Sequence, residues 1–132
     1  MLISPVLDLT TATVRRTDAA RPDPFLAPDF IERTNLTYAG DTPLIHPRLD
    51  LLGADPGRWP PVLVQTGGLE CLTGDAELLR SAVSEAGGRC EVQIWPGRLH
   101  GFPAFDIPEG RAAREYGGRF LAAPPVTRPG AA

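Results

Sequence analysis

The sequence predicts an α/β fold built on parallel strands. Residues 61–66 form a largely apolar run, which is typical of a strand buried on both faces of a sheet. Residues 75–86 carry apolar side chains at helical spacing and end at Gly87-Gly88, and residues 90–95 alternate like a second strand. A strand, a helix and a strand in succession form one βαβ unit, so we expect the two strands to be parallel with a right-handed crossover.

The chain before this unit is expected to be a short strand followed by irregular segments. Residues 2–8 are apolar enough for a strand, which Pro5 interrupts because proline supplies no backbone N–H to a sheet. Residues 9–27 are polar and show no period, so we predict a long loop, a kind of segment that is often functional. Residues 39–60 are punctuated by Gly, Pro and Asp and are expected to be irregular.

Two further helices are expected, at residues 28–38 and 109–121. Gly117 and Gly118 weaken the second helix by about 1 kcal/mol each relative to alanine. The candidate core contacts of the two helices are Phe30, Ile31, Leu36 and Tyr38 in the first, and Ala112, Ala113, Tyr116, Phe120 and Leu121 in the second.

The composition excludes several classes of protein. A chain of 132 residues fits one modest domain, expected at residues 1–121, with a disordered tail at 122–132. The net charge of −3 provides no basic field for nucleic acid or anionic lipid. No apolar run approaches the roughly 20 residues of a membrane span, and the start lacks the basic region of a signal peptide, so we expect a soluble, cytoplasmic protein. All 13 basic residues are arginine, which excludes a lysine nucleophile within the chain.

The two cysteines are predicted to be free thiols. Cys71 follows one strand of the βαβ unit and Cys90 begins its parallel neighbour, which separates them by roughly 15–20 Å along the strands. A disulfide requires Cα atoms within about 7 Å. The cysteines have neither the CxxC spacing nor the histidine pair of a zinc site, and no metal is expected.

Two loops are the candidate functional site, because functional residues collect at the carboxyl ends of parallel strands. The loop at 67–75 contains Glu70, and the loop at 96–102 contains His100. A carboxylate beside an imidazole fixes the histidine tautomer and stabilises the imidazolium that forms in acid–base catalysis. The sequence therefore predicts an acid–histidine pair at one edge of the sheet.

Structural interpretations of the same residues stay open at this point. Glu70 is also compatible with an exposed loop charge, and His100 with a polar residue that has ordinary hydrogen bonds. Asp75 is well placed to cap the helix that follows it. His46 lies in irregular chain without an acidic neighbour and is interpreted as structural.

Beyond these patterns, the chain resembles the C-terminal part of the α/β-hydrolase fold-3 family, the hormone-sensitive-lipase-like esterases. The segment Pro60-Pro-Val-Leu-Val-Gln-Thr-Gly-Gly-Leu-Glu-Cys-Leu72 resembles the family's acid strand and loop, and Trp95-Pro-Gly-Arg-Leu-His-Gly-Phe102 resembles its histidine loop. Residues 2–10, 23–30 and 38–41 also resemble family segments, in the family's order. The resemblance implies the C-terminal portion of an α/β-hydrolase, with parallel strands, flanking helices and an incomplete sheet.

The resemblance also implies roles for individual residues. His100 falls on the family's catalytic histidine and Glu70 on its catalytic acid. The chain departs from the family pattern at Leu69 and Gly74, where acidic residues are usual, so a shifted loop would make Asp75 the acid instead. Phe102 either helps to shape the substrate pocket or simply packs.

The 132 residues contain neither a G-x-S-x-G nucleophile elbow nor a His-Gly-Gly-Gly-type oxyanion segment. The only serines are Ser4, Ser81 and Ser84, and none has the flanking glycines of such an elbow. The resemblance thus implies a partial carboxylic-ester hydrolase that needs no cofactor and is inactive alone. Because a truncated sheet exposes an apolar edge, we expect the chain either to associate, with an N-terminal half or with itself, or to be poorly stable. The alternatives are a non-catalytic binding or interaction module on a truncated hydrolase scaffold, or a peptidase or other hydrolase, since the fold does not fix the function.

Overall fold

Three strands carry the architecture of residues 1–123, which are the residues that the structure, a computed structural model, describes. β1 spans Leu2–Ile3, β2 spans Val62–Gly67 and β3 spans Cys90–Trp95. They form one parallel sheet in the order β1-β2-β3. The α/β architecture with parallel strands is confirmed, and in the described part of the chain the sheet is open at both edges.

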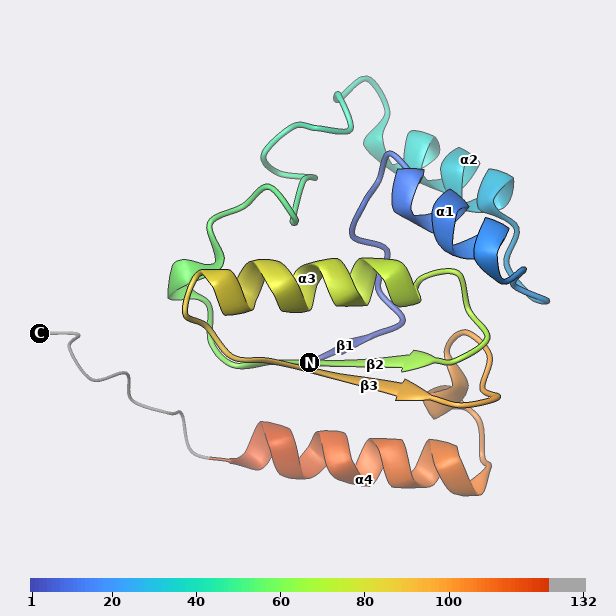
Figure 1. Cartoon of the computed structure of the whole chain (residues 1–132), viewed down its shortest axis with the longest axis vertical. Coiled ribbons are helices and arrows are strands. Elements are labelled where there is room, and N and C mark those ends of the chain that lie inside the picture. Colours follow the sequence, from blue (N-terminus) through green and yellow to red (C-terminus); the bar gives the residue numbers. More distant parts are fainter. Residues whose placement is uncertain (124–132) are drawn as a thin grey trace, which may run out of the picture.

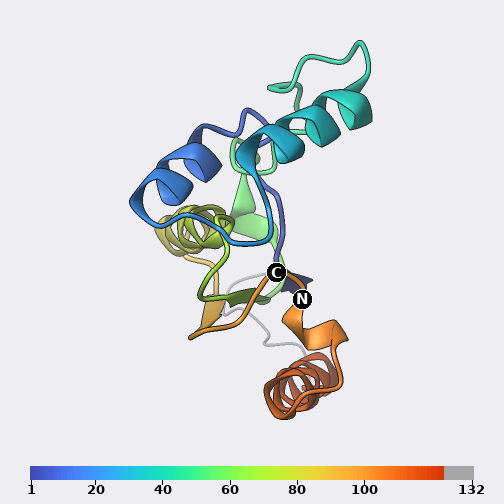
Figure 2. The same cartoon turned by 90° about the vertical axis from the view of Figure 1, so that its right-hand side faces the viewer.

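The sheet lies between two helices that cover its opposite faces (Figure 1, Figure 2). α3 spans Thr73–Glu85 and α4 spans Pro108–Ala122, close to the predicted bounds of both helices. Alternate residues of the central strand face the two helices, as the period of a strand requires. Val64 joins the core cluster beneath α3, whereas Gln65 Nε2 donates to the backbone oxygen of Ala113 in α4 at 2.9 Å.

The predicted loop over 9–27 is wrong, because it contains the helix α1 at Ala12–Ala20. The helix has little apolar periodicity, since Val14 is its one fully buried apolar side chain. The first turn of α1 is stabilised by a residue that precedes the helix, because Asp8 Oδ2 accepts the backbone N–H of Thr13 at 2.9 Å. Packing on α3 therefore supports a helix that the sequence pattern alone does not reveal.

The helix α2 spans Pro28–Ala39, which confirms the predicted element, but most of its expected core contacts are wrong. Ile31 is buried, whereas Phe30, Leu36 and Tyr38 are exposed. The reason is that the buried face of α2, formed by Ile31, Asn35 and Ala39, packs against α1 and the segment at Cys71–Leu72 rather than against the sheet.

The predictions for α4 need a smaller correction. Ala113 is buried and Tyr116 and Phe120 are half-buried, but Ala112 and Leu121 are exposed. Ala122 belongs to the helix rather than to the expected tail, and residues 124–132 of that tail lie outside the described residues.

The strand expected over 2–8 is limited to β1, because the backbone turns at Ser4, where φ is 42°. The connection at 39–60 is irregular as expected, apart from one 3-10 turn at Pro56–Arg58. Within residues 1–123, no helix has the length and the apolar character that a membrane crossing requires.

Candidate active site

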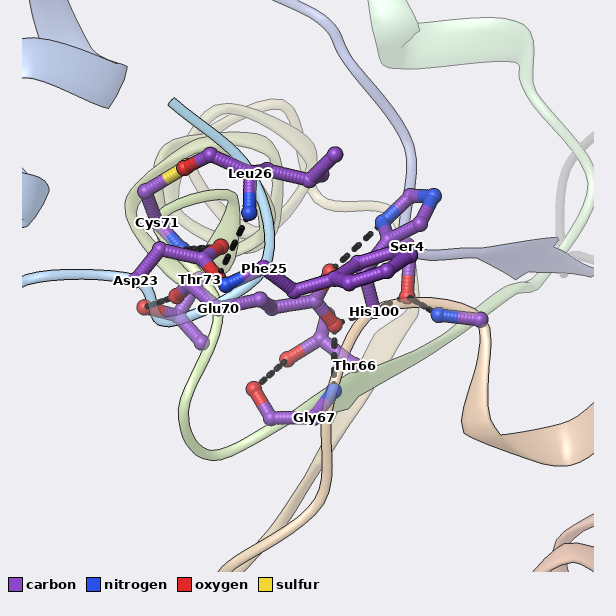
Figure 3. Close-up of polar contacts among 11 residues, drawn as sticks. Ser4, Asp23, Phe25, Leu26, Thr66, Gly67, Glu70, Cys71, Thr73 and His100 are labelled. Atoms are coloured by element: carbon purple, nitrogen blue, oxygen red, sulfur yellow. Dashed lines mark hydrogen bonds and ion pairs between the residues drawn. The ribbon is translucent and has the colours of Figure 1, made fainter. Parts of the chain in front are cut away.

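Glu70 and His100 meet at the carboxyl ends of β2 and β3 (Figure 3). The distance from His100 Nδ1 to Glu70 Oε2 is 2.9 Å, a good hydrogen bond. The Glu70 side chain is fully buried, whereas the His100 side chain is 32% exposed. The two loops that the sequence singled out therefore place a buried carboxylate behind a partly accessible imidazole.

Two glycines allow the loops to approach this closely. A Cβ atom on Gly67 would lie only 2.6 Å from the backbone oxygen of Leu99, and a Cβ on Gly68 only 2.9 Å from that of Trp95. The backbones are hydrogen-bonded instead, with Gly68 N–H donating to Trp95 O at 2.6 Å and Leu69 N–H donating to Arg98 O at 3.0 Å. The acid loop and the histidine loop thus form one connected unit.

The buried carboxylate has donors on both oxygens. Oε1 accepts the Ser4 hydroxyl at 2.7 Å and the backbone N–H of Gly67, while Oε2 faces His100. A buried charge is tolerated only when such donors replace water. This arrangement rules out the interpretation of Glu70 as an exposed loop charge.

From the sequence, Ser4 is considered only as a possible nucleophile, and its contact with Glu70 is not predicted. The signal that could have revealed it is strand register. Ile3 pairs with Gln65, so Ser4 lies beside the end of β2, where the acid loop begins.

The imidazole of His100 is oriented by its contact with the acid. Because an ionised carboxylate can only accept, the proton of neutral His100 lies on Nδ1, and Nε2 faces away from Glu70 (Figure 3). The next residue, Gly101, has φ 67°, a conformation that favours glycine. Since Nδ1 carries the proton, Nε2 bears the lone pair that can accept a proton from another group.

Phe102 packs at the end of the histidine loop. Its side chain is buried, and its ring centroid lies 5.3 Å from that of Trp95 at the end of β3. This position favours the packing role over the role in a substrate pocket.

Asp75, the second candidate for the acid, has other partners. It is fully buried in the first turn of α3, and its Oδ2 accepts the backbone N–H groups of Leu7 at 2.8 Å and Asp8 at 2.9 Å. Burial raises the pKa of Asp75 above its usual value, an effect that these two hydrogen bonds only partly offset. Asp75 thus ties the segment after β1 to α3, and it neither caps α3 nor contacts His100.

Asp23 fixes the far side of the acid loop (Figure 3). Its Oδ2 accepts the backbone N–H of Cys71 at 2.9 Å, and its Oδ1 accepts those of Phe25 and Leu26 at 2.8 and 3.0 Å. Burial alone would raise the pKa of Asp23, but these hydrogen bonds outweigh burial and lower it. These hydrogen bonds hold the connection between α1 and α2 against the acid loop, next to Glu70.

Both cysteines are free, as predicted. Burial, reinforced by the nearby carboxylate of Asp23, raises the pKa of the Cys71 thiol to about 12. The thiolate is the nucleophilic form of cysteine, so Cys71 cannot serve as a nucleophile near neutral pH. Among residues 1–123, no group of three or more His, Cys, Asp or Glu side chains could hold a metal ion.

The described serines do not complete the pair. The Ser4 hydroxyl is bound to Glu70, and Ser81 and Ser84 are exposed on α3. His46 lies in the irregular connection, where its Nδ1 accepts the backbone N–H of Arg48 at 3.2 Å.

A cavity of about 630 Å³ lies at the amino ends of β2 and β3. It is lined by Pro60, Pro61 and Arg89, which directly precede β2 and β3, and by residues of α4. Because the strands are parallel, their amino ends are remote from Glu70 and His100. This cavity is not part of the acid–histidine site.

Comparison with known proteins identifies the family of this chain. Residues 1–104 match the family model described as alpha/beta hydrolase fold. The chain belongs to this family. The α/β-hydrolase chain is 31% identical over 121 residues to an acetyl-hydrolase of Streptomyces hygroscopicus, covering 90% of this chain and 40% of that protein. It is 38% identical over 61 residues to the esterase LipU of Mycobacterium tuberculosis, covering 44% of this chain and 20% of that protein.

The fold comparison agrees. An esterase of the bacterial hormone-sensitive lipase family superposes on this α/β-hydrolase with a TM-score of 0.82 at 27% identity, covering 91% of this chain and 41% of the esterase. The resemblance to hormone-sensitive-lipase-like esterases is therefore confirmed. The chain spans about 40% of the length of the acetyl-hydrolase and of this esterase.

Proposed function

We propose that this α/β-hydrolase chain supplies the acid, Glu70, and the histidine, His100, of a serine–acid–histidine triad that hydrolyses carboxylic esters. The nucleophilic serine and the oxyanion donors belong to a segment outside these 132 residues. The observation that supports the proposal is the 2.9 Å contact between His100 Nδ1 and the buried carboxylate of Glu70, at the sheet edge where such sites lie. The esterases that the chain resembles suggest a small-molecule ester as substrate.

In the proposed reaction, the serine oxygen attacks the ester carbonyl carbon while His100 Nε2 takes the hydroxyl proton. Glu70 stabilises the imidazolium that results and keeps the ring oriented. The tetrahedral intermediate then collapses, and His100 gives its proton to the departing alcohol. The collapse leaves the acyl group on the serine oxygen. Water then attacks the acyl carbon while His100 takes a water proton, and the second intermediate releases the carboxylic acid as His100 returns the proton to the serine oxygen. No metal or organic cofactor takes part in these steps.

The chain alone is expected to show no catalysed hydrolysis of a short p-nitrophenyl ester. In a triad hydrolase of another fold, loss of the nucleophile lowers kcat by about 10⁶. Robust turnover by the purified 132-residue chain that disappears in His100→Ala would contradict the proposed division of the triad.

The decisive test begins with the DNA upstream of the reading frame, which should encode a G-x-S-x-G segment and a His-Gly-Gly-Gly-like segment. In the extended protein, His100→Ala should lower kcat by about 10⁶ and Glu70→Gln by about 10⁴, as in triad proteases. His46→Ala and the exposed Glu85→Gln are matched controls that should keep full activity. Absence of such segments, with a stable isolated chain, would favour the non-catalytic binding module instead.

A further inference from the structure

The Ser4 hydroxyl lies between the acid and the histidine loop (Figure 3). The residue is almost completely buried, and its Oγ is 2.7 Å from Glu70 Oε1 and 3.2 Å from the backbone nitrogen of Gly101. We propose that Ser4 is a positioning residue of the acid–histidine pair, which directs Glu70 Oε2 toward His100. This inference rests on the proposed function, since it concerns the same pair.

Hydrogen-bond chemistry fixes the role of each Ser4 contact. The hydroxyl has a single proton and the ionised carboxylate can only accept, so Ser4 donates to Glu70 Oε1. The hydroxyl lone pairs remain available for the N–H of Gly101. One side chain thus joins the acid to the backbone of the residue that follows His100.

The same contacts assign the two oxygens of the carboxylate. Oε1 receives two donors, from Ser4 and from the Gly67 backbone, and is occupied. Oε2 is left to accept the Nδ1–H of His100. Without the Ser4 hydroxyl, Oε1 would keep only the Gly67 N–H as a donor. The carboxylate could then rotate more easily, because the hydrogen bond from Ser4 would no longer hold it.

The backbone at position 4 gives an independent indication. Ser4 N–H still donates to Gln65 O at 2.8 Å, so the strand pairing reaches this residue, but φ is 42°. Positive φ is uncommon for residues other than glycine and persists only where the surroundings enforce it. Glycine would adopt this conformation more easily but has no hydroxyl, so the need for a short donor explains why a serine occupies the position.

The experiment uses the full 132-residue chain labelled with ¹⁵N. Imidazole ¹⁵N spectra of the neutral rings report which ring nitrogen carries the proton. Wild-type His100 should show a protonated Nδ1, and His46 should show the opposite tautomer because its Nδ1 accepts from Arg48. His46 is therefore an internal reference, assigned with His46→Gln.

We expect Ser4→Ala to move both His100 nitrogen shifts toward the values of a tautomer mixture and to leave the His46 shifts in place. Ser4→Gly should do the same although it relieves the backbone, which keeps the test decisive if Ser4→Ala does not fold. Ser84→Ala, an exposed serine on α3, is the matched control and should change nothing.

Glu70→Gln separates the two possible failures. If Glu70→Gln alters the His100 tautomer but Ser4→Gly does not, the positioning role of Ser4 is wrong and the acid–histidine pair stands. If the His100 tautomer is unaffected even by Glu70→Gln, the pair itself is wrong, and both the proposed function and the role of Ser4 fail.

Discussion

Gly67 is the residue on which the close approach of the two loops depends, and Gly67→Ala tests this directly. A Cβ at this position would lie 2.6 Å from Leu99 O and 2.7 Å from the carbonyl carbon of Arg98. Ordinary van der Waals contact begins near 3.4 Å, and Arg98 O lies closer still to this Cβ, so the histidine loop would have to retreat by more than about 0.8 Å. The obstructing atoms are backbone, which cannot move aside as a flexible side chain would.

The expected cost of Gly67→Ala is about 2 kcal/mol of unfolding free energy, within the usual range for overpacking a tight site. The retreat also stretches the hydrogen bond from Leu69 N–H to Arg98 O, now 3.0 Å, and draws His100 away from Glu70. Urea denaturation followed by circular dichroism gives the loss of stability. The imidazole ¹⁵N shifts of His100 report the loss of the contact with Glu70.

The control for this substitution is Gly118→Ala, because a Cβ at position 118 meets no atom within 4 Å. Two results together would refute the reasoning. The first is an unfolding free energy of Gly67→Ala within about 0.5 kcal/mol of the wild-type value, which is the range of an ordinary surface substitution. The second is imidazole ¹⁵N shifts of His100 that are the same in both proteins.

Three further predictions concern stability and reactivity. Gly118→Ala should raise the unfolding free energy by about 1 kcal/mol, which is the difference in helix propensity between the two residues. Gly117→Ala should raise the unfolding free energy clearly less, because a Cβ at this position meets the Met1 side chain. Thermal melts of both variants check this difference. The pKa of Asp23 is lowered in the folded state, so the ionised carboxylate stabilises the fold above the usual pKa of 3.8, and this stabilisation is lost as the pH falls through the folded pKa. Asp23→Asn should therefore unfold more easily than wild type at pH 7. Urea titrations should show that this difference in unfolding free energy shrinks below pH 3.8. Because Cys71 is buried and the pKa of its thiol is about 12, it should resist a thiol reagent at pH 8 in the folded chain and react on unfolding, as mass spectrometry of labelled peptides would show.

Local patterns in the sequence were sufficient for the central elements. The apolar run at 61–66 and the alternation at 90–95 correspond closely to β2 and β3. The reason is that a strand in a covered parallel sheet buries its side chains and must therefore be largely apolar. The order of these elements also placed Glu70 and His100 at one edge. The helix α1 was missed because its stability comes from contacts with α3 and from Asp8, not from its own pattern.

Exposure of the helices was less predictable than their existence. Tyr38 and Leu121 are apolar residues at helical spacing, yet both are exposed, since the buried stripe of a helix is decided by what lies against it. For α2, the neighbour is α1 rather than the sheet.

By itself, the sequence determined the type and order of the main elements and the two loops that bear the acid and the histidine. Only the tertiary structure decided which carboxylate reaches His100: Glu70 does, while Asp75, five residues later, bonds to the segment after β1. It also brought in Ser4, which is 66 residues from Glu70 in the chain. The physical reason is that local propensity acts over a few residues, whereas the direction of a buried carboxylate depends on donors that strand pairing brings from distant parts of the chain.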